Sequence, residues 1–349
     1  MKRIMECVPN FSEGRDKSVI DAIVNAIASA EAGSEKVKVL HVDAGEAANR
    51  TVVTFIGTPE AVCEAAFQGV KMAGERIDMR HQHGTHPRSG ATDVLPFVPI
   101  AGITLEECAV MARTLARRVY DELGIACYCY EAAAYIPERK NLAVCRAGEY
   151  EALPQKLEDS ARRPDFGPDH YNDTVARSGA CNIGARNYLI AVNFNLNTQS
   201  VEEATEIACD VREKGRKIKA DEGEGYSWKR GSLKGCKAIG WYIDEYGVAQ
   251  VSMNITDIYS TPLHTAYEEV VRAAQARGIT VTGTEIIGLV PKSVLVDAGR
   301  HFLAIRKRAH EESLMEDDEK TLIQVAIEAM GLDDLCPFDP GKKIIEYLM

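Results

Sequence analysis

The sequence predicts an α+β protein made of two consecutive sandwich subdomains with a substrate cleft or tunnel between them. The order strand, helix, strand, strand, helix, strand occurs in the first hundred residues and again between residues 185 and 290. A split β-α-β-β-α-β unit is the ferredoxin-like fold, so two such units in tandem are expected. We assign residues 1–180 to an N-terminal subdomain and residues 181–349, including C-terminal helices, to a second subdomain.

Apolar spacing and β-branched runs define the six elements of the first repeat. Strands are predicted at residues 3–8, 37–42, 52–56 and 94–100, and helices at 19–30 and from 58 onward. Proline is favoured in the first turn of a helix, which places the start of the second helix near Pro59.

The same patterns define the second repeat and the elements around the two cores. Strands are predicted at 188–196, 238–243, 248–255 and within 279–287, and helices at 201–211 and 266–274. Further elements are helices at 104–123, 291–309 and 319–330 and a strand at 126–130. Residues 154–180 lack periodicity and are expected to link the domains, and the charged, glycine-rich residues 214–237 are expected to form a mobile loop.

Composition and charge narrow the classes of function. The 349 residues are 46% hydrophobic and 27% charged, as in a globular protein with one or two cores. A formal net charge of −11 argues against a nucleic-acid partner, because such proteins present a basic face. A local arginine cluster can still bind an anionic small molecule.

Neither a membrane span nor a secretion signal is expected. No apolar run approaches the roughly 18 residues that cross a bilayer. The N-terminus meets Glu6 and Pro9 too early for a signal-peptide apolar region. The ten cysteines include no CxxC pair and lie mostly in apolar stretches, a pattern typical of reduced, buried thiols. We therefore expect a cytoplasmic protein.

Three histidines within six residues are the leading candidates for chemistry: His81, His83 and His86. Three imidazoles on one loop could bind a metal ion, but no acidic ligand pattern such as HExxH accompanies them, so no metal is expected. A structural role, capping backbone groups of the loop, is at least as plausible for His81 and His83. For His86 we favour an acid–base role, because Gly84 leaves room for a substrate and Arg88 could hold an anion.

A histidine base needs an orienting partner, usually a carboxylate on its other ring nitrogen. Asp43, which ends a predicted strand just before a glycine, is one candidate, and Asp93, at the exit of the histidine loop, is the rival. Aspartate also favours such positions through hydrogen bonds to its own turn, so the pattern alone leaves both open.

Ten segments, in order and over essentially the whole chain, together resemble the glutamate formiminotransferase family. They are 6–14 (ECVPNFSEG), 42–45 (VDAG), 49–52 (NRTV), 84–91 (GTHPRSGA), 146–154 (RAGEYEALP), 165–168 (DFGP), 184–186 (GAR), 288–291 (GLVP), 336–338 (CPF) and 344–348 (IIEYL). The resemblance implies a one-carbon transferase of histidine breakdown that passes the formimino group of N-formimino-glutamate to N5 of tetrahydrofolate, with glutamate released. It also implies two α/β subdomains with folate between them, a homodimer, and tetrahydrofolate as co-substrate.

The resemblance assigns roles residue by residue. The catalytic histidine falls on His86 and its supporting aspartate on Asp43. Glu285 stands at a further active-site position where the bifunctional vertebrate form has glutamine, and a carboxylate donates a hydrogen bond only when protonated. The implied folate-binding residues are Asn10, Asp165, Phe166, Gly167, Pro168, Tyr171, Ser178 and Gly179. Vertebrate members carry a cyclodeaminase domain after the shared tail, so this chain is expected to lack that second activity.

The chemistry follows from the residue types. N5 attacks the amidine carbon, and the tetrahedral centre expels glutamate once N5 loses a proton and the departing nitrogen gains one, so one imidazole can serve both steps. Both substrates are anionic, which makes Arg50, Arg88 and Arg186 candidate carboxylate partners. Surface or hairpin ion pairs are the alternative role of Arg50 and Arg186.

Three other functions compete with formimino transfer. A glutamate formyltransferase would use N-formyl-glutamate with the same base. A folate-binding or scaffolding protein without activity would bind folate independently of His86. A metal hydrolase would use the histidine run to bind zinc.

Overall fold

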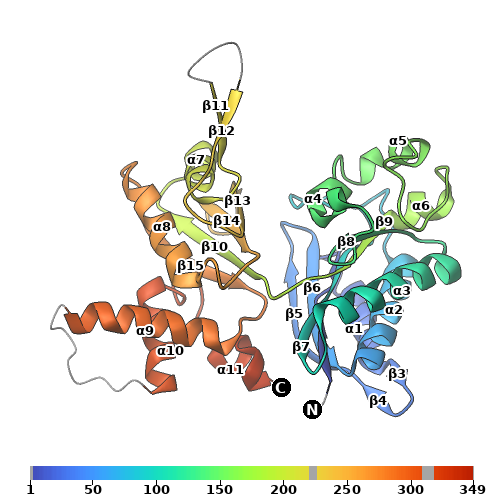
Figure 1. Cartoon of the computed structure of the whole chain (residues 1–349), viewed down its shortest axis with the longest axis horizontal. Coiled ribbons are helices and arrows are strands. Elements are labelled where there is room, and N and C mark those ends of the chain that lie inside the picture. The colour runs from blue at the N-terminus through green and yellow to red at the C-terminus, as the bar shows by residue number, and fades with distance from the viewer. Residues whose placement is uncertain (1–2, 220–225, 309–317, 349) are drawn as a thin grey trace. The chain divides into compact units, whose positions relative to one another are not determined.

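The computed structural model describes residues 3–219, 226–308 and 318–348, which form two compact units, Met1–Asn187 and Tyr188–Met349 (Figure 1). Each unit combines a β-sheet with helices packed on it, so the mixed α/β architecture expected of an α+β protein is confirmed.

The first unit contains a seven-stranded sheet. Its strands are β1 (Ile4–Cys7), β2 (Asn10–Phe11), β5 (Lys38–Gly45), β6 (Arg50–Gly57), β7 (Thr92–Ala101), β8 (Ala126–Glu131) and β9 (Ala180–Ala185). Strands β5, β6, β1 and β7 are antiparallel neighbours in that order, and β2 continues the line of β1 between β6 and β7. Strand β9 then pairs in parallel with β7, and β8 pairs in parallel with β9.

Helices cover both faces of this sheet. They are α1 (Lys17–Ser29), α2 (Pro59–Arg76), α3 (Leu105–Leu123), α4 (Leu142–Cys145), α5 (Leu153–Glu158) and α6 (Asp173–Ser178), and a small hairpin, β3 (Glu31–Ala32) and β4 (Glu35–Lys36), follows α1. Helices α1, α2 and α3 bury their apolar sides against one face. Segments α4 to α6 pack on the other face, over Tyr128 and Tyr130 of β8.

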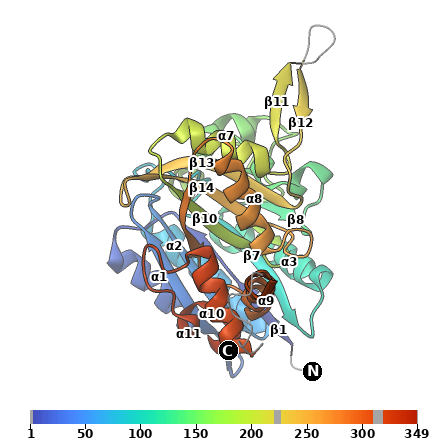
Figure 2. The same cartoon turned by 90° about the vertical axis from the view of Figure 1, so that its left-hand side faces the viewer.

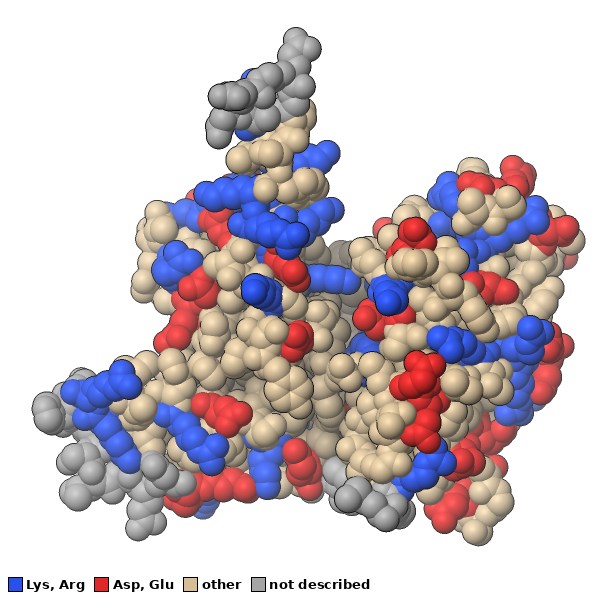
Figure 3. Space-filling view, viewed as in Figure 1, with Lys and Arg blue, Asp and Glu red and all other residues tan. Residues whose placement is uncertain are grey.

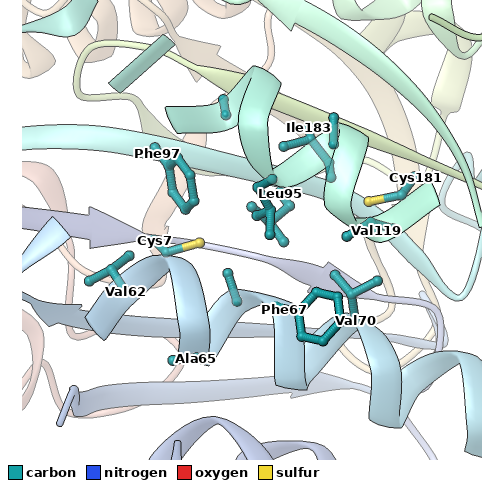
Figure 4. Packing of buried hydrophobic residues seen from close by; sticks show 14 of the residues in the cluster. Cys7, Val62, Ala65, Phe67, Val70, Leu95, Phe97, Val119, Cys181 and Ile183 are labelled. Atoms are coloured by element: carbon teal, nitrogen blue, oxygen red, sulfur yellow. The ribbon is translucent and has the colours of Figure 1, made fainter. Parts of the chain in front are cut away.

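The main core of the first unit has alternate strand residues on one side and helix residues on the other. Figure 4 shows Phe67 and Val70 of α2 and Val119 of α3 close to Leu95 of β7 and Ile183 of β9. All five are buried, and burial of such a side chain stabilises a fold by about 1.5–3 kcal/mol. The apolar, β-branched run of β7 and the period of 3.6 in α2 and α3 explain why the sequence pattern located these elements.

The second unit contains a four-stranded antiparallel sheet in the order β13, β14, β10, β15. Its elements are β10 (Ile190–Leu196), α7 (Val201–Val211), β11 (Arg216–Lys219), β12 (Tyr226–Lys229), β13 (Cys236–Ile243), β14 (Val248–Ile255), α8 (Leu263–Gln275), β15 (Val281–Ile287), α9 (Lys292–Arg308), α10 (Glu319–Met330), α11 (Pro340–Lys343) and α12 (Ile345–Leu348). Helices α7 and α8 bury one face of the sheet, and α9 packs along α10 (Figure 2).

Both repeats connect their strands in the same way. The chain order β1-α1-β5-β6-α2-β7 and the chain order β10-α7-β13-β14-α8-β15 each place the first strand between the third and the fourth. The second strand lies beyond the third in both sheets. The predicted strands and long helices of both repeats therefore match observed elements within a few residues.

Residues 154–180 do not form the structureless interdomain segment that was expected. They contain most of α5, all of α6 and a backbone pairing of Phe166 with Cys127, and they belong to the first unit. The next strand, β9, was not predicted, and its pairing with β7 and β8 carries the first unit to Asn187, seven residues beyond the predicted boundary at 180.

The charged segment 214–237 is not a simple loop either. Strands β11 and β12 pair in antiparallel fashion over four residues each, and residues 220–225 between them lie outside the described residues. Basic side chains gather over this hairpin (Figure 3), and Lys214 and Lys217 lie over the ring of Trp228.

Candidate active site

The histidine loop, residues 81–88, is anchored by Asn49 in the turn between β5 and β6. The Asn49 amide donates to Gln82 Oε1 at 2.6 Å and to the His83 carbonyl at 3.0 Å, and its Oδ1 accepts from Gly14 N at 3.0 Å. Asn49 is buried and has a φ of +48°, a conformation that asparagine tolerates better than most residues. A Cβ on Gly84 would lie 2.2 Å from the Ala48 carbonyl oxygen, so the loop and the turn are in close contact.

His86 has a defined tautomer in this loop. Its Nδ1 lies 2.8 Å from the carbonyl oxygen of Pro87. A carbonyl oxygen only accepts hydrogen bonds, so this contact favours a proton on Nδ1 and a lone pair on Nε2; Arg146 Nη2, which only donates, lies farther from the same Nδ1, at 3.4 Å. His86 therefore has the form that a base acting through Nε2 requires. His81 and His83 are exposed.

Asp93, at the start of β7, is connected to the histidine loop through its hydrogen bonds with Ser89 and Arg146. The residue is fully buried, its Oδ2 accepts from Arg50 Nη1 at 2.6 Å and from Arg146 Nη2 at 2.7 Å, and its Oδ1 accepts from Ser89 N at 2.9 Å. Arg146 Nη2 also donates to the Pro87 carbonyl and lies 3.4 Å from His86 Nδ1. The network thus joins Asp93 to the backbone and ring of the histidine loop.

The electrostatic surroundings keep His86 neutral. Burial and the guanidinium groups of Arg50 and Arg146 lower the pKa of His86 from 6.5 to about 3, and Asp93 offsets this only in part. Burial alone would raise the pKa of Asp93, but the same two arginines outweigh it and lower that pKa. At neutral pH the site therefore contains an imidazole, a carboxylate and two guanidinium groups.

The candidate residues Asp43 and Asn10 lie on the sheet face that carries Arg50. Asp43 of β5 and Asn10 of β2 are both direct cross-strand partners of Val52, and directly opposed residues share one face of a sheet. Arg50, two residues before Val52, donates from Nε to Asn10 Oδ1 at 3.0 Å. Asn10, Arg50 and Asp43 thus occupy adjacent positions of one face.

Arg88, predicted to hold a substrate carboxylate, is occupied by carboxylates of the protein. It donates to Glu151 at 2.7 Å and to Glu149 at 3.2 Å, and its Nε donates to the Gln82 carbonyl at 3.0 Å. Tyr150 N donates to the Arg88 carbonyl at 2.9 Å, so the segment following α4 is attached to the histidine loop. Arg88 stabilises the loop in this structure.

The implied folate-binding residues fall into two groups. Phe166 is buried in the first unit, and Asp165, whose side chain is 8% exposed, pairs with Arg139 and accepts from Cys129 N. Gly167 and Pro168 follow them, and Tyr171 is exposed, with its hydroxyl 3.0 Å from that of Tyr150. Ser178 and Gly179 lie beside the exit of the histidine loop: Ala91 N donates to the Ser178 carbonyl at 2.8 Å, and Ala180 N donates to the Ser89 carbonyl at 2.9 Å.

Substituting Gly179 by alanine is expected to destabilise the first unit. Gly179 has a φ of +67°, and a Cβ there would lie 2.3 Å from the Ser89 carbonyl oxygen. Gly278 is a matched control, because it has a φ of +70° but open space where a Cβ would lie. We expect Gly278→Ala to cost about 1–2 kcal/mol of unfolding free energy from backbone strain alone and Gly179→Ala to cost more. Urea denaturation measures both, and equal losses would contradict the close contact.

Arg186 and Glu285 complete the predicted set. Arg186 follows β9, where its N donates to the Phe97 carbonyl at 3.0 Å and its Nη1 donates to the Asn187 carbonyl at 3.0 Å. Glu285 belongs to β15 of the second unit and accepts from Asn193 Nδ2 at 3.1 Å and from the Tyr246 hydroxyl at 3.2 Å. Both carboxyl oxygens of Glu285 therefore accept hydrogen bonds within the second unit.

Arg146 is the site residue that sequence reasoning missed. It opens one of the family-like motifs (RAGEYEALP), which was the available signal, but only the fold brings it against His86 and Asp93, 60 and 53 residues away in sequence. Asn182 was also missed; it is fully buried in β9, and its amide donates to the Asp93 carbonyl at 2.8 Å.

Over residues 3–219, 226–308 and 318–348, no group of three or more His, Cys, Asp and Glu side chains is placed to bind a metal ion. Among the helices within those ranges, none is long and apolar enough to cross a membrane. All ten cysteines lie in the described part of the chain as free thiols, and eight of them are buried.

Comparison with known proteins gives matches along both units. The family model of the N-terminal subdomain of the formiminotransferase domain matches residues 4–186, and that of the formiminotransferase domain matches residues 191–349. Formimidoyltransferase-cyclodeaminase of Gallus gallus is 45% identical over 349 residues, which is all of this chain and 60% of the relative. This chain therefore spans about three fifths of that bifunctional relative.

Two shorter relatives are matched over nearly their full length. Glutamate formimidoyltransferase of Streptococcus pyogenes serotype M1 is 39% identical over 317 residues, which is 91% of this chain and 99% of the relative. Glutamate formimidoyltransferase of Thermoplasma acidophilum is 40% identical over 304 residues, which is 86% of this chain and 93% of the relative. The chain belongs to the formiminotransferase family.

Proposed function

We propose that this chain transfers the formimino group of N-formimino-glutamate to N5 of tetrahydrofolate and releases glutamate. The observation that carries the proposal is the neutral His86, whose Nδ1 proton is bound by the Pro87 carbonyl and whose Nε2 keeps its lone pair. It stands in a chain that is 39–40% identical to two curated glutamate formimidoyltransferases over 93–99% of their lengths. The reaction places the chain in histidine breakdown.

The proposed step requires one proton carrier. N5 of tetrahydrofolate forms a bond to the amidine carbon, and Nε2 of His86 takes the proton that N5 loses. The bond between that carbon and the glutamate nitrogen then breaks, and Nε2 returns the proton to this nitrogen. The products are 5-formimino-tetrahydrofolate and glutamate, and no oxidant or metal ion is needed.

Other roles in the proposal rest on the resemblance and on placement. Asp43 supports the imidazolium from the sheet face shared with Arg50, and Glu285 serves as a carboxylate acceptor in the active site. Arg50 and Arg186 are carboxylate partners. Folate contacts are proposed at Asn10, Asp165, Phe166, Gly167, Pro168, Tyr171, Ser178 and Gly179.

The finer fold and the assembly are also proposals. The strand orders of both units are those of a ferredoxin-like fold, and we infer two ferredoxin-like subdomains, the first extended by β9 and β8. The folate-binding cleft or tunnel between the subdomains, the homodimer and the cytoplasmic location rest on the family resemblance, on the charge and on the free cysteines.

The choice of donor is tested by assaying N-formimino-glutamate and N-formyl-glutamate side by side with tetrahydrofolate. We expect turnover with the formimino donor and a kcat/KM at least tenfold lower with the formyl donor. A site that forms a hydrogen bond with the imino N–H of the formimino group rejects the formyl analogue, which has a carbonyl oxygen in its place. Turnover with the formyl donor alone would overturn the proposed function. Loss of activity on treatment with a chelator would favour the metal hydrolase instead.

A further inference from the structure

The buried network around His86 contains one more positive charge than negative charge. Arg50 and Arg146 carry two positive charges, and Asp93, the carboxylate between them, carries one negative charge. Side-chain exposure is 10% for Arg50, 15% for Arg146 and 0% for Asp93, so solvent screens the excess charge poorly. Such a site favours an anion beside the arginines.

Arg146 also has unused hydrogen-bonding capacity. Its Nη2 serves Asp93 and the Pro87 carbonyl. Within the described part of the chain, its Nε is buried and has no hydrogen-bond partner. A buried donor without a partner costs about 1–3 kcal/mol, so a ligand that accepts from it gains correspondingly. The other arginine of the loop, Arg88, is already paired with Glu149 and Glu151.

We propose that Arg146 binds a carboxylate of the glutamate part of the donor, and that this binding makes His86 a stronger base. The inference rests on the proposed function and adds a residue to it. A carboxylate bound to Arg146 provides an acceptor for its unpaired Nε. The charges of Arg50, Arg146, Asp93 and the bound carboxylate then sum to zero. The imidazolium of His86, which forms when Nε2 takes a proton, is then no longer repelled by an excess cation.

Binding of the donor carboxylate to Arg146 would also explain how His86 can act as a base although its pKa is low in the free protein. Burial, Arg50 and Arg146 hold the pKa of His86 at about 3, which is low for a base that works near neutral pH. The charged groups that act most strongly on His86 are Arg50 from β6, Asp93 from β7 and Arg146 from the end of α4. Asp43 of β5, the proposed support of the imidazolium, lies on the sheet face that carries Arg50. Neutralising Arg146 with an anion raises the pKa of His86, so basicity appears when the donor is bound and not before.

The test uses L-glutamate, the product that carries the same carboxylates, and nuclear magnetic resonance of ¹⁵N-labelled histidine. In the wild-type protein we expect the His86 ring to stay neutral in the free state down to about pH 5, and its protonation midpoint to rise with saturating glutamate. In Arg146→Gln we expect a higher midpoint in the free protein, no further rise with glutamate, and a Kd for glutamate raised roughly 10- to 100-fold.

Two further variants separate this role from a structural one. Arg146→Lys keeps the charge but loses the planar fork, so the low midpoint should persist while glutamate binds more weakly. Arg118→Gln removes the ion pairs of Arg118 with Glu64 on α2 and Glu122 on α3. This variant should leave the protonation midpoint of His86 unchanged and the Kd for glutamate within about twofold of wild type. Arg50 still pairs with Asp93 in Arg146→Gln, so the fold has no unbalanced buried charge.

The outcomes distinguish the proposed role of Arg146 from the proposed transferase function. A wild-type protein that transfers the formimino group, together with an Arg146→Gln variant that binds glutamate equally well, would overturn the role of Arg146 and leave the proposed function standing. If the protonation midpoint of His86 in the wild-type protein did not change with saturating glutamate, the role of Arg146 would also be overturned and the proposed function would stand. A wild-type protein that neither binds glutamate nor transfers would overturn both.

Discussion

Replacing His86 by alanine is expected to lower kcat by about 10²- to 10⁴-fold, the range of general acid–base catalysis. The variant removes the Nε2 that takes the proton of N5 and returns it to the glutamate nitrogen. His86 lies on a partly exposed loop that Asn49, Arg88 and Gly84 hold independently, so the fold should remain intact. Steady-state kinetics measure kcat, and equilibrium titration should show an unchanged Kd for tetrahydrofolate.

His81→Ala and His83→Ala are the matched controls, because both histidines belong to the same loop and both are exposed. Each should retain activity within about twofold, as surface substitutions away from special features do. A near-normal kcat in His86→Ala would refute the assignment of His86 as the base. A large loss of kcat in His81→Ala or His83→Ala would indicate that the other histidines of the loop also take part in catalysis.

Replacing Asp93 by asparagine is expected to destabilise the protein by about 3–5 kcal/mol, because removing one partner leaves buried charge uncompensated. Asp93 is fully buried between Arg50 and Arg146, and its Oδ1 also fixes Ser89. The variant should also lose activity, since the two remaining cations destabilise the imidazolium of His86. Urea denaturation at pH 7 measures the loss of unfolding free energy.

Asp21→Asn is the control for this variant, because it breaks an exposed ion pair with Lys17 and should change stability by less than about 1 kcal/mol. The wild-type protein adds an independent check. The pKa of Asp93 is lowered on folding, so its contribution to stability is complete above about pH 4 and declines as the pH falls further. Equal stability of Asp93→Asn and wild type at pH 7 would contradict a stabilising network.

Local patterns located most of the fold, and their failures have physical causes. The apolar, β-branched run of β7 and the helical spacing of α2 and α3 are properties of contiguous residues, so the sequence alone located these elements. Strand β9 contains small and polar residues (ACNIGA) in place of such a run, and its partners β7 and β8 lie far away in the sequence. The segment before it is held by contacts such as that between Phe166 and Cys127, which only the folded chain reveals.

The candidate site also has features that the sequence predicts and features that only the folded chain shows. His86 was identified from its motif and from the glycines around it. The sequence pattern leaves the choice between Asp43 and Asp93 open; the contact of Asp93 with the loop through Arg146 joins residues 53 positions apart and could not be seen in the linear pattern. The pairing of Arg88 with Glu149 and Glu151 joins residues more than sixty positions apart and was invisible in the linear pattern.

The most direct test of the central claim is the stoichiometry of the reaction catalysed by the purified protein. N-formimino-glutamate and tetrahydrofolate should disappear together, with one 5-formimino-tetrahydrofolate formed for each glutamate released, and neither product should appear when tetrahydrofolate is omitted. Glutamate release without tetrahydrofolate, or no release with both substrates present, would contradict a folate-dependent transfer based on His86.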